Sequence, residues 1–405
     1  MAVSINEALE IIYKNISSVS TEVIPIELAL GRILAKECIA DFDMPRFDNS
    51  TRDGYAVKCA DAGSTVMATD VIYAGDKPDI LLRKGEAIRI MTGAPIPHGC
   101  EAVVPFEVVS ENGKEITLPD TIEDQMFIRY AGEDIKRNMV YLHQGDKVTA
   151  YSVALLASQG ITHVTVYRKV IVTVFSSGDE LCCHYEQIES HQLYNSNTPM
   201  FLSRAKELGC EVSFLQNIGD TVEQLEEAIN ASLNADIIIT SGGMNFGDKD
   251  FTKEAFANCG LQQLFNRVEI KPGRPVAFGT IGHTAIINLP GNPLAGMVNF
   301  EIFIRTLIHK MSGSSAYFLR SIDTVIAEPY KQKQGQYTVV LGTFDGEAFT
   351  PLKKQMAGMV APMQKTEAMI LTDASLMLLE EGAKVKIIPV NWEFFSRHKK
   401  DFYTY

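Results

Sequence analysis

The chain has 405 residues, of which 46% are hydrophobic and 21% charged, and its net charge is −13 with a pI of about 5.2. This length predicts two to four domains rather than one core. The acidic balance excludes nucleic acid as the main partner, because duplex binding needs a basic surface.

Targeting and redox signals are missing from the sequence. No apolar run approaches the ~20 residues that span a bilayer, and the first residues lack the basic and apolar regions of a signal peptide. The seven cysteines include no CxxC pair, which predicts free thiols and argues against a zinc site. We therefore expect a cytoplasmic protein that does not bind membranes.

The first part of the chain has a helical pattern. Residues 1–44 are predicted to be mainly helical, with Ser4 or Asn6 as the first N-cap. A helix and a strand are predicted again further on, at 150–159 and 162–167. We expect these segments to form one N-terminal part.

Between them, residues 56–130 carry short strand patterns separated by turn residues. Strands are predicted at 103–109, 115–118 and 126–129. The Asn112-Gly113 pair is a strong hairpin signal. This region is predicted to be a small β domain.

From residue 169 to 312 strands alternate with helices, which is typical of a doubly wound α/β domain. Short strands with Gly and Asp turns follow from 320 to 392 and predict a separate small β domain. The predicted α/β strands are 169–175, 211–215, 236–239, 275–279 and 285–289, and the helices are 198–208, 222–233, 252–257 and 294–310.

The most informative segment is a β-branched run that ends in Gly242-Gly243 and is followed by Asp248 and Asp250. Paired glycines let the backbone turn sharply and approach a ligand. In open parallel sheets, ligands bind outside the carboxyl ends of the strands. The carboxylates suit a hard cation such as Mg²⁺. Taken alone, the segment also fits an ordinary strand-to-helix turn.

Three more polar segments follow predicted strands or precede helices. Ser176–Leu181 offers hydroxyls and amides to a phosphate and a carboxylate, Glu180, to a metal, although a plain turn with Asp179 as a helix cap explains it equally. Asn197 suits a helix start, where free amides attract anions. In Leu289–Pro293, Asn292 is the expected N-cap before a proline in the first turn.

Basic residues flank the turn between two of the predicted strands. Arg267, Lys271 and Arg274 lie within eight residues and form a candidate anion clamp, or a solvated charged turn. In the small β domain, Asp53 and Thr92 lie in polar loops. Each of these segments is weak by itself.

Taken together, these segments resemble molybdopterin molybdotransferases, which insert molybdenum into the pterin cofactor and include the corresponding domain of gephyrin. The match runs from Pro45 to Gly296, and the order of domains fits the whole chain. The matching motifs are Ser50–Ala56, Thr92–Pro97, Gly132–Ile135, Gly178–Leu181, Ser241–Gly243, Lys271–Pro275 and Leu289–Pro293.

The resemblance implies a reaction in which adenylylated molybdopterin and molybdate give molybdenum cofactor and AMP with the help of Mg²⁺. It assigns catalytic roles to Asp53, Thr92, Asp134, Glu180, Arg267 and Lys271, and metal binding to Glu180, Asp220 and Asp250. Substrate binding falls to Ser177, Gly178, Asp179, Asn197, Asp220, Ser241, Gly242, Gly243, Lys271, Gly273, Arg274, Pro290, Gly291, Asn292 and Pro293.

The implied fold is multidomain, α/β plus β. A central doubly wound, molybdopterin-binding α/β domain (169–315) is joined by an elongated N-terminal linker or dimerisation part (1–45 plus 136–168), a small β domain (46–135) and a C-terminal β-barrel (318–405). The implied partners are a second copy in a homodimer, with the small β domain closing the partner's site, and contacts with the adenylylating enzyme and molybdoenzyme chaperones.

The sequence departs from the family pattern at a few positions. Arg52 stands where a small or apolar residue is usual, and Arg274 where Lys is common. The family's Pro-Gly-Arg and Gly-Ser segments are replaced around Gly335 and Gly358. Three alternatives stay open: a scaffold that binds pterin nucleotide without turnover, a tungsten-inserting variant, and an adenylyltransferase acting one step earlier, which the flanking domains disfavour.

Overall fold

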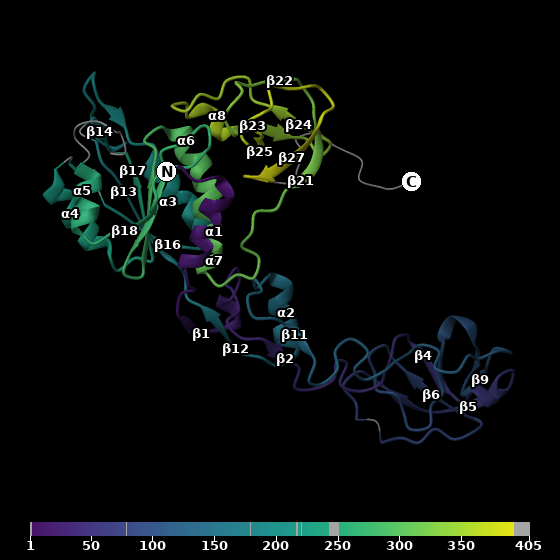
Figure 1. Cartoon of the computed structure of the whole chain (residues 1–405). Helices are drawn as coiled ribbons and strands as arrows, with labels where there is room; N and C mark the ends of the chain where they lie inside the picture. Colours follow the sequence, from purple (N-terminus) through teal and green to yellow (C-terminus); the bar gives the residue numbers. More distant parts are fainter. Residues whose placement is uncertain are drawn as a thin grey trace. The chain divides into compact units, whose positions relative to one another are not determined.

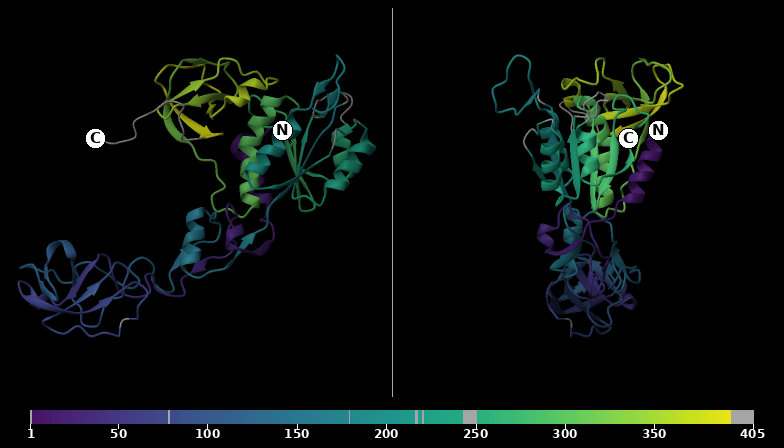
Figure 2. Two further views of the ribbon diagram at one scale, coloured as in Figure 1. Left: turned by 180° about the vertical axis from the view of Figure 1, so that it is seen from behind. Right: turned by 60° about the vertical axis from the view of Figure 1, so that its left-hand side comes forward.

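The computed structural model describes residues 2–77, 79–178, 180–215, 218–219, 221–242 and 251–392. They divide into two compact units (Figures 1 and 2). One unit comprises Met1–Ala35, Gln144–Thr149 and His163–Tyr405, and the other comprises Lys36–His143 and Ala150–Thr162. Each unit is described by itself.

The first unit begins with helix α1 (Ile5–Asn15), which a capping box starts. Ser4 Oγ accepts from the Glu7 amide at 3.2 Å, and the Glu7 carboxylate accepts from the Ser4 amide at 2.7 Å. The helix ends at Asn15. The prediction of helix through residue 44 is therefore wrong beyond this point.

Two strands lie within the range that was predicted to be mainly helical. In the first unit, β1 (Thr21–Pro25) pairs antiparallel with the distant β12 (His163–Tyr167). Its β-branched residues suit a strand, and local periodicity does not reveal a partner some 140 residues away in sequence. In the second unit, β2 (Cys38–Ile39) pairs with β11 (Val140–Leu142). Between β1 and β2, η1 (Ile26–Leu28) is a short 3₁₀ turn.

A six-stranded sheet forms the centre of the first unit, in the order β16-β13-β17-β20-β19-β18. The first four strands are parallel, β19 pairs antiparallel with β20, and β18 pairs antiparallel with β19, so the predicted doubly wound sheet carries an antiparallel edge. Strand β18 was not predicted. The bounds are β13 (Ile171–Ser176), β16 (Glu211–Phe214), β17 (Ile237–Ser241), β18 (Gln262–Phe265), β19 (Ala277–Ile281) and β20 (Thr284–Leu289).

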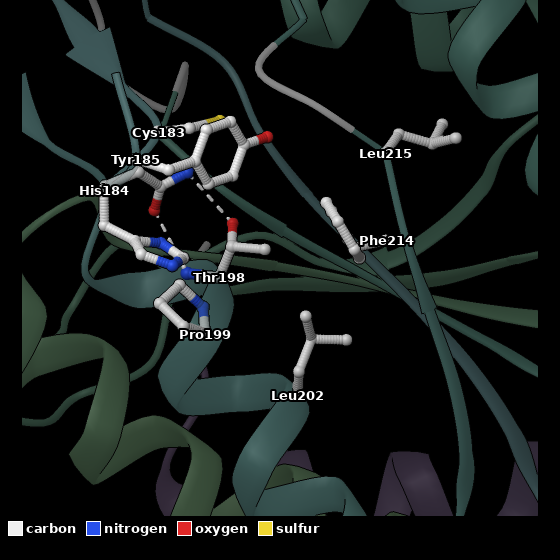
Figure 3. A pocket seen from close by; sticks show the side chains of 9 residues that line it. Cys183, His184, Tyr185, Thr198, Pro199, Leu202, Phe214 and Leu215 are labelled. Carbon is white, nitrogen blue, oxygen red and sulfur yellow. Dashed lines mark hydrogen bonds between the residues drawn. The ribbon is translucent and has the colours of Figure 1, made fainter. Parts of the chain in front are cut away.

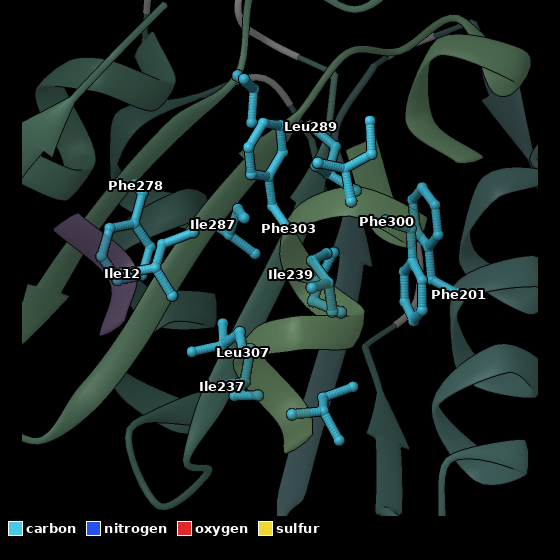
Figure 4. Close-up of a cluster of buried hydrophobic side chains, with 14 of the residues drawn as sticks. Ile12, Phe201, Ile237, Ile239, Phe278, Ile287, Leu289, Phe300, Phe303 and Leu307 are labelled. Atoms are coloured by element: carbon cyan, nitrogen blue, oxygen red, sulfur yellow. The ribbon is translucent and has the colours of Figure 1, made fainter. Parts of the chain in front are cut away.

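Helices cover both faces of this sheet. On one face, α4 (Val222–Ser232) and α5 (Phe251–Asn258) bury Leu225 and Phe256 against it. On the other lie α1, α3 (Asn197–Glu207) and a long helix in which α6 (Pro293–Asn299) passes through a π turn (Phe300–Ile304) into α7 (Arg305–Met311). The predicted helix 294–310 is confirmed. In Figure 4, Phe303 and Leu307 lie beside strand isoleucines, and the Phe300 ring stacks on Phe201 of α3.

The C-terminal part of the first unit is a closed five-stranded barrel, β21-β24-β23-β25-β27, which confirms the expected β-barrel. Strand β23 is buried on both faces. Val340 packs inside the barrel, whereas Val339 and Leu341 belong to the core of the α/β part. The bounds are β21 (Ile322–Ile326), β23 (Thr338–Phe344), β24 (Ala348–Pro351), β25 (Ala368–Thr372) and β27 (Lys384–Pro389), with β22 (Tyr330–Lys331), α8 (Ala361–Gln364) and β26 (Leu378–Leu379) beside them.

The second unit contains the small β domain, a six-stranded sheet in the order β7-β4-β6-β5-β9-β8. The predicted hairpin is confirmed, because Asn112 pairs with Glu115 across Gly113, whose φ is 65°. The bounds are β4 (Gly54–Val57), β5 (Thr65–Ile72), β6 (Glu86–Ile90), β7 (Ala102–Pro105), β8 (Ser110–Asn112) and β9 (Glu115–Thr117), with a β3 (Asn49–Ser50) and β10 (Ile128–Arg129) pair and helix α2 (Ala150–Ser158).

The core of the long helix gives a first prediction. Phe303 is fully buried, and Phe303→Ala is expected to lower the free energy of unfolding by about 3–5 kcal/mol through lost burial and a residual cavity. Urea titration followed by circular dichroism measures it. Tyr151→Ala, at a side chain 87% exposed, is the control and should change stability by less than about 0.5 kcal/mol. Equal losses in the two variants would contradict this packing.

Candidate functional site

The polar turns that follow three parallel strands lie at one edge of the central sheet. Ser176 at the end of β13 is in register with Ser241 at the end of β17, and Ser241 is in register with Leu289 at the end of β20. The chain leaves β13 toward β16 on one side and continues with β17 on the other, so the strand order reverses between β13 and β17. Such a switch point is where open α/β sheets bind ligands.

Asn197, at the start of α3, ties these turns together. Its side-chain amide donates to Ser241 Oγ and to the Gly291 carbonyl, both at 2.8 Å. Ser241 Oγ donates in turn to the Pro290 carbonyl at 3.3 Å. Asn197 and Ser241 are both buried. The predicted binding residues therefore share one hydrogen-bonded assembly in which Asn197 holds the turns in place.

Glycine is required at the turn after β17. Gly242 has a φ of +99°, and a Cβ there would lie 2.6 Å from the Ser177 carbonyl oxygen. The Gly291 backbone is close as well, because a Cβ on Gly291 would meet Gly242 Cα at 3.6 Å. The three turns therefore pack backbone against backbone: the Ser177 amide donates to the Ser241 carbonyl at 3.3 Å, and the Gly242 amide donates to the Leu289 carbonyl at 3.4 Å.

The basic turn between β18 and β19 is fixed by the barrel and by α6. The Lys271 amide donates to the Tyr337 carbonyl at 2.8 Å, and the Lys271 carbonyl accepts from the Val339 amide at 2.7 Å. Asn299 donates to the Gly273 carbonyl at 3.1 Å. Gly273 has a φ of +107°, and a Cβ there would collide with the Asn299 amide.

A cleft of about 710 Å³ opens beside this turn, between the α/β part and the barrel. Lys271 and Arg274 line it from the turn, and Lys331 and Lys333 line it from the barrel. The lining includes no carboxylate among the described residues. In a chain with a net charge of −13, this cleft is a local basic site suited to an anion.

The cleft adjoins the switch point through predicted residues. Pro290 and Asn292, which follow β20, also line it. Asn292 occupies the N-cap position of α6 and Pro293 the first turn, as predicted. Arg267 lies outside the cleft lining; its backbone carbonyl accepts from the Val3 amide at 3.0 Å.

Sequence reasoning missed the barrel's share of this cleft. Lys331, Lys333, Gln336 and Gln355 line it, although the barrel segments depart from the family pattern. The available signal was the alternation of Lys and Gln before Gly335. That pattern did not indicate which face of the barrel the side chains occupy.

The candidate metal ligands are only partly described. Glu180 follows the β13 turn, and its carboxylate lies against Gly178, where a Cβ would be 2.8 Å from Oε2. The predicted residues Asp179, Asp220, Gly243 and Asp250 lie outside the described residues, as does Asp248. Within the described ranges, no group of three His, Cys, Asp or Glu side chains is arranged for a metal ion.

The second unit places two of its predicted residues together. Asp53 Oδ1 accepts from the Thr92 amide at 2.7 Å and from its hydroxyl at 2.8 Å. The Thr92 amide, then the hydroxyl, and the nearby Arg89 charge hold the pKa of Asp53 below its ordinary value. Asp134 lies on another loop of this unit, where its amide donates to the Met44 carbonyl at 3.0 Å.

Comparisons with known protein families agree with this architecture. Residues 173–310 match the model described as a probable molybdopterin binding domain, and residues 3–160 match the MoeA N-terminal region, domains I and II. The fold and the switch-point site thus define a protein of molybdopterin metabolism. None of the helices in the described ranges is long and apolar enough to span a membrane.

Individual proteins similar to this chain identify the family more narrowly. A molybdopterin molybdenumtransferase of Staphylococcus epidermidis is 31% identical over 399 residues, 95% of each chain. One of Haemophilus influenzae is 38% identical over 301 residues, 73% of this chain and 74% of the relative. A crystal structure of a molybdopterin biosynthesis MoeA protein from Pyrococcus horikoshii has a TM-score of 0.83 at 27% identity, covering 97% of this chain and 100% of that one. The chain belongs to the molybdopterin molybdenumtransferase family.

The Gly242 turn gives a second prediction. Gly242→Ala is expected to lower the free energy of unfolding by about 1–3 kcal/mol more than Gly260→Ala, measured by urea titration. Both glycines have positive φ, so both variants bear the backbone strain, but no atom lies within 4 Å of a Cβ on Gly260. Equal losses would show that the contact with Ser177 does not constrain the turn.

The Asp53–Thr92 contact gives a third. Thr92→Val removes the hydroxyl donor, so the pKa of Asp53 should rise toward its ordinary value without reaching it, because the backbone amide remains. Wild-type Asp53 should accordingly stay charged to lower pH than the variant. Carboxyl ¹³C NMR titration measures both. Thr65→Val, whose hydroxyl contacts Thr117, is the control and should leave Asp53 unchanged.

Proposed function

We propose that this protein inserts molybdenum into molybdopterin, taking adenylylated molybdopterin and molybdate and releasing AMP. The observation that carries the proposal is the acid-free basic cleft beside a switch point of close-packed glycine turns, in an otherwise acidic chain. Both substrates are anionic. Membership of the molybdenumtransferase family supports the same reaction.

The arrangement suits cleavage of a phosphoanhydride near an oxyanion. The Ser177 hydroxyl and the Gly178 amide, at the turn after β13, are the donors that we assign to phosphate oxygens. Lys271 and Arg274 place fixed cations beside the Pro290–Asn292 turn, and these offset the charge that develops as AMP leaves. Lys331 and Lys333 extend the positive field to the entering molybdate.

Mg²⁺, when bound, would offset phosphate charge in the same step. Carboxylate oxygens are the ligands that this ion prefers. Glu180 is the described carboxylate at the β13 turn and fits by its chemistry, and we propose Asp220 and Asp250 as its companions. Among the described residues, the carboxylate of Glu180 is therefore the basis for proposing a Mg²⁺ site here.

We further propose that a second copy of the chain completes the site. Asp53, Thr92 and Asp134 belong to the second unit, where the Asp53 carboxylate is held by two hydrogen bonds from Thr92. In this proposal residues 1–45 and 136–168 form the dimerisation part, 46–135 the small β domain, 169–315 the α/β domain and 318–405 the barrel.

We also propose a cellular compartment and protein partners for this chain. All seven cysteines are free thiols, which supports a reducing cytoplasm. We also propose contacts with the adenylylating enzyme, which would supply the substrate, and with molybdoenzyme chaperones. A scaffold without turnover and a tungsten-inserting enzyme are the competing functions.

The test is a turnover assay with adenylylated molybdopterin, Mg²⁺ and either molybdate or tungstate, following AMP release. The wild type should release AMP, and Asp53→Ala and Lys271→Ala should each lower the rate at least about 100-fold, as expected for loss of a charge-stabilising group. Substrate binding without AMP release would instead identify a scaffold. Faster turnover with tungstate would identify the tungsten variant.

Mixing the two variants tests the dimer. Co-refolded or exchanged equal amounts of Asp53→Ala and Lys271→Ala chains should recover about a quarter of wild-type activity, because half of the dimers are mixed and each mixed dimer has one intact site of two. No recovery would show that both residues act within one chain. Sedimentation velocity confirms that mixed dimers form.

A further inference from the structure

A second pocket is lined in part by residues at and just before the start of α3, next to Asn197 in the sequence. It has a volume of about 110 Å³ and is lined by residues of the segment after β14 (Leu181–Cys182), of α3, and of the end of β16. Phe214 ends β16, so the pocket opens at the carboxyl edge of the sheet, where the switch point also lies.

The pocket has an apolar floor and aromatic walls. Pro199 and Leu202 of α3 form its base, and Phe214 and Leu215 form one side. In Figure 3 the Tyr185 ring and the His184 imidazole lie across the pocket from Phe214 and Leu215. The two rings contact edge to face, with their centroids 5.2 Å apart.

These aromatic groups are unusually exposed for apolar surface. Phe214 is 53% exposed and Tyr185 is 60% exposed. In the folded chain these two side chains are left partly open to solvent, and a flat ring that entered the pocket would cover both. The exposure thus marks a surface on which a planar group is stabilised by stacking.

Two polar residues, Asn195 and Thr198, form a polar neck between this pocket and the turn after β13. Asn195 accepts from the Thr198 amide at 3.1 Å and donates to the Thr198 hydroxyl at 3.0 Å (Figure 3). The Thr198 hydroxyl also lies 2.9 Å from Ser176 Oγ at the end of β13. Both Asn195 and Thr198 line the pocket. One hydrogen-bonded chain therefore runs from the pocket to the switch point.

The lining chemistry selects the ligand. The residues that line the pocket in the described part of the chain include no Lys or Arg, so phosphate or molybdate has no strong partner there. Pockets that enclose drug-sized ligands measure about 300–1,000 Å³, so this one has room for a single ring system. A flat, neutral nitrogen heterocycle matches the aromatic walls and the polar neck.

We propose that this pocket binds the heteroaromatic ring of the substrate, the adenine or the pterin, while the anionic groups occupy the switch point and the basic cleft. The inference rests on the proposed function, which gives the substrate two flat rings joined through phosphates. Tyr185 and Phe214 hold the ring by stacking, and the Asn195–Thr198 neck sets its depth.

Isothermal titration calorimetry on the full-length chain tests this with three probes: AMP, ribose 5-phosphate, which lacks the base, and pterin. The double variant His184→Ala/Tyr185→Ala should weaken binding of the ring-bearing probe about 5- to 100-fold, as expected for loss of ring stacking. Ribose 5-phosphate should bind all variants alike. Loss confined to AMP assigns the adenine, and loss confined to pterin assigns the pterin.

Two further variants keep the test independent of the loop's own folding. Leu202→Trp fills the pocket from α3 and should weaken the same probe, whereas Tyr185→Phe keeps the stacking surface and should bind like the wild type. Leu193→Ala, 63% exposed on the same segment and outside the pocket, is the control. Unchanged affinity for both rings in the double variant, or no ring binding by the wild type, overturns the proposal. Missing AMP release in the turnover assay concerns the proposed function instead.

Discussion

The amide group of Asn197 is the contact on which the arrangement of the switch point depends. One side chain donates to Ser241 Oγ and to the Gly291 carbonyl, and so joins the turns after β17 and β20 at the start of α3. A buried amide that satisfies two partners in fixed directions costs free energy when either is displaced. The turns can therefore approach as closely as their missing Cβ atoms allow, and the Ser177 and Gly242 amides donate to carbonyls of the neighbouring strand ends.

Charge is separated in space within this chain. An acidic surface keeps like-charged molecules apart, while Lys271, Arg274, Lys331 and Lys333 gather around one cleft. Because the field at a site depends on nearby charges, anions are attracted there despite the net charge of −13. In our proposal the pocket at the start of α3 takes the heteroaromatic ring of the substrate, whereas this cleft takes its anionic groups.

Much of this was predictable from local sequence. The alternation of strands and helices identified the α/β part, and Asn292-Pro293 marked the start of α6 because each residue suits its position in the first turn. Strand β1 was not predictable, since its partner β12 lies far along the chain. Lys331 and Lys333 were missed for a related reason: the barrel's closure, and not the order of residues, decides that they line the cleft.

Strand β23 shows that the boundary between two parts of the sequence need not be a boundary of the hydrophobic core. Gly313–Ser315 separates the helix from the barrel along the chain, yet Val339 and Leu341 complete the core around Phe303 while Val340 fills the barrel. Alternate residues of β23 thus pack in two different hydrophobic cores. A change in the position of this strand would therefore disturb the packing of both cores.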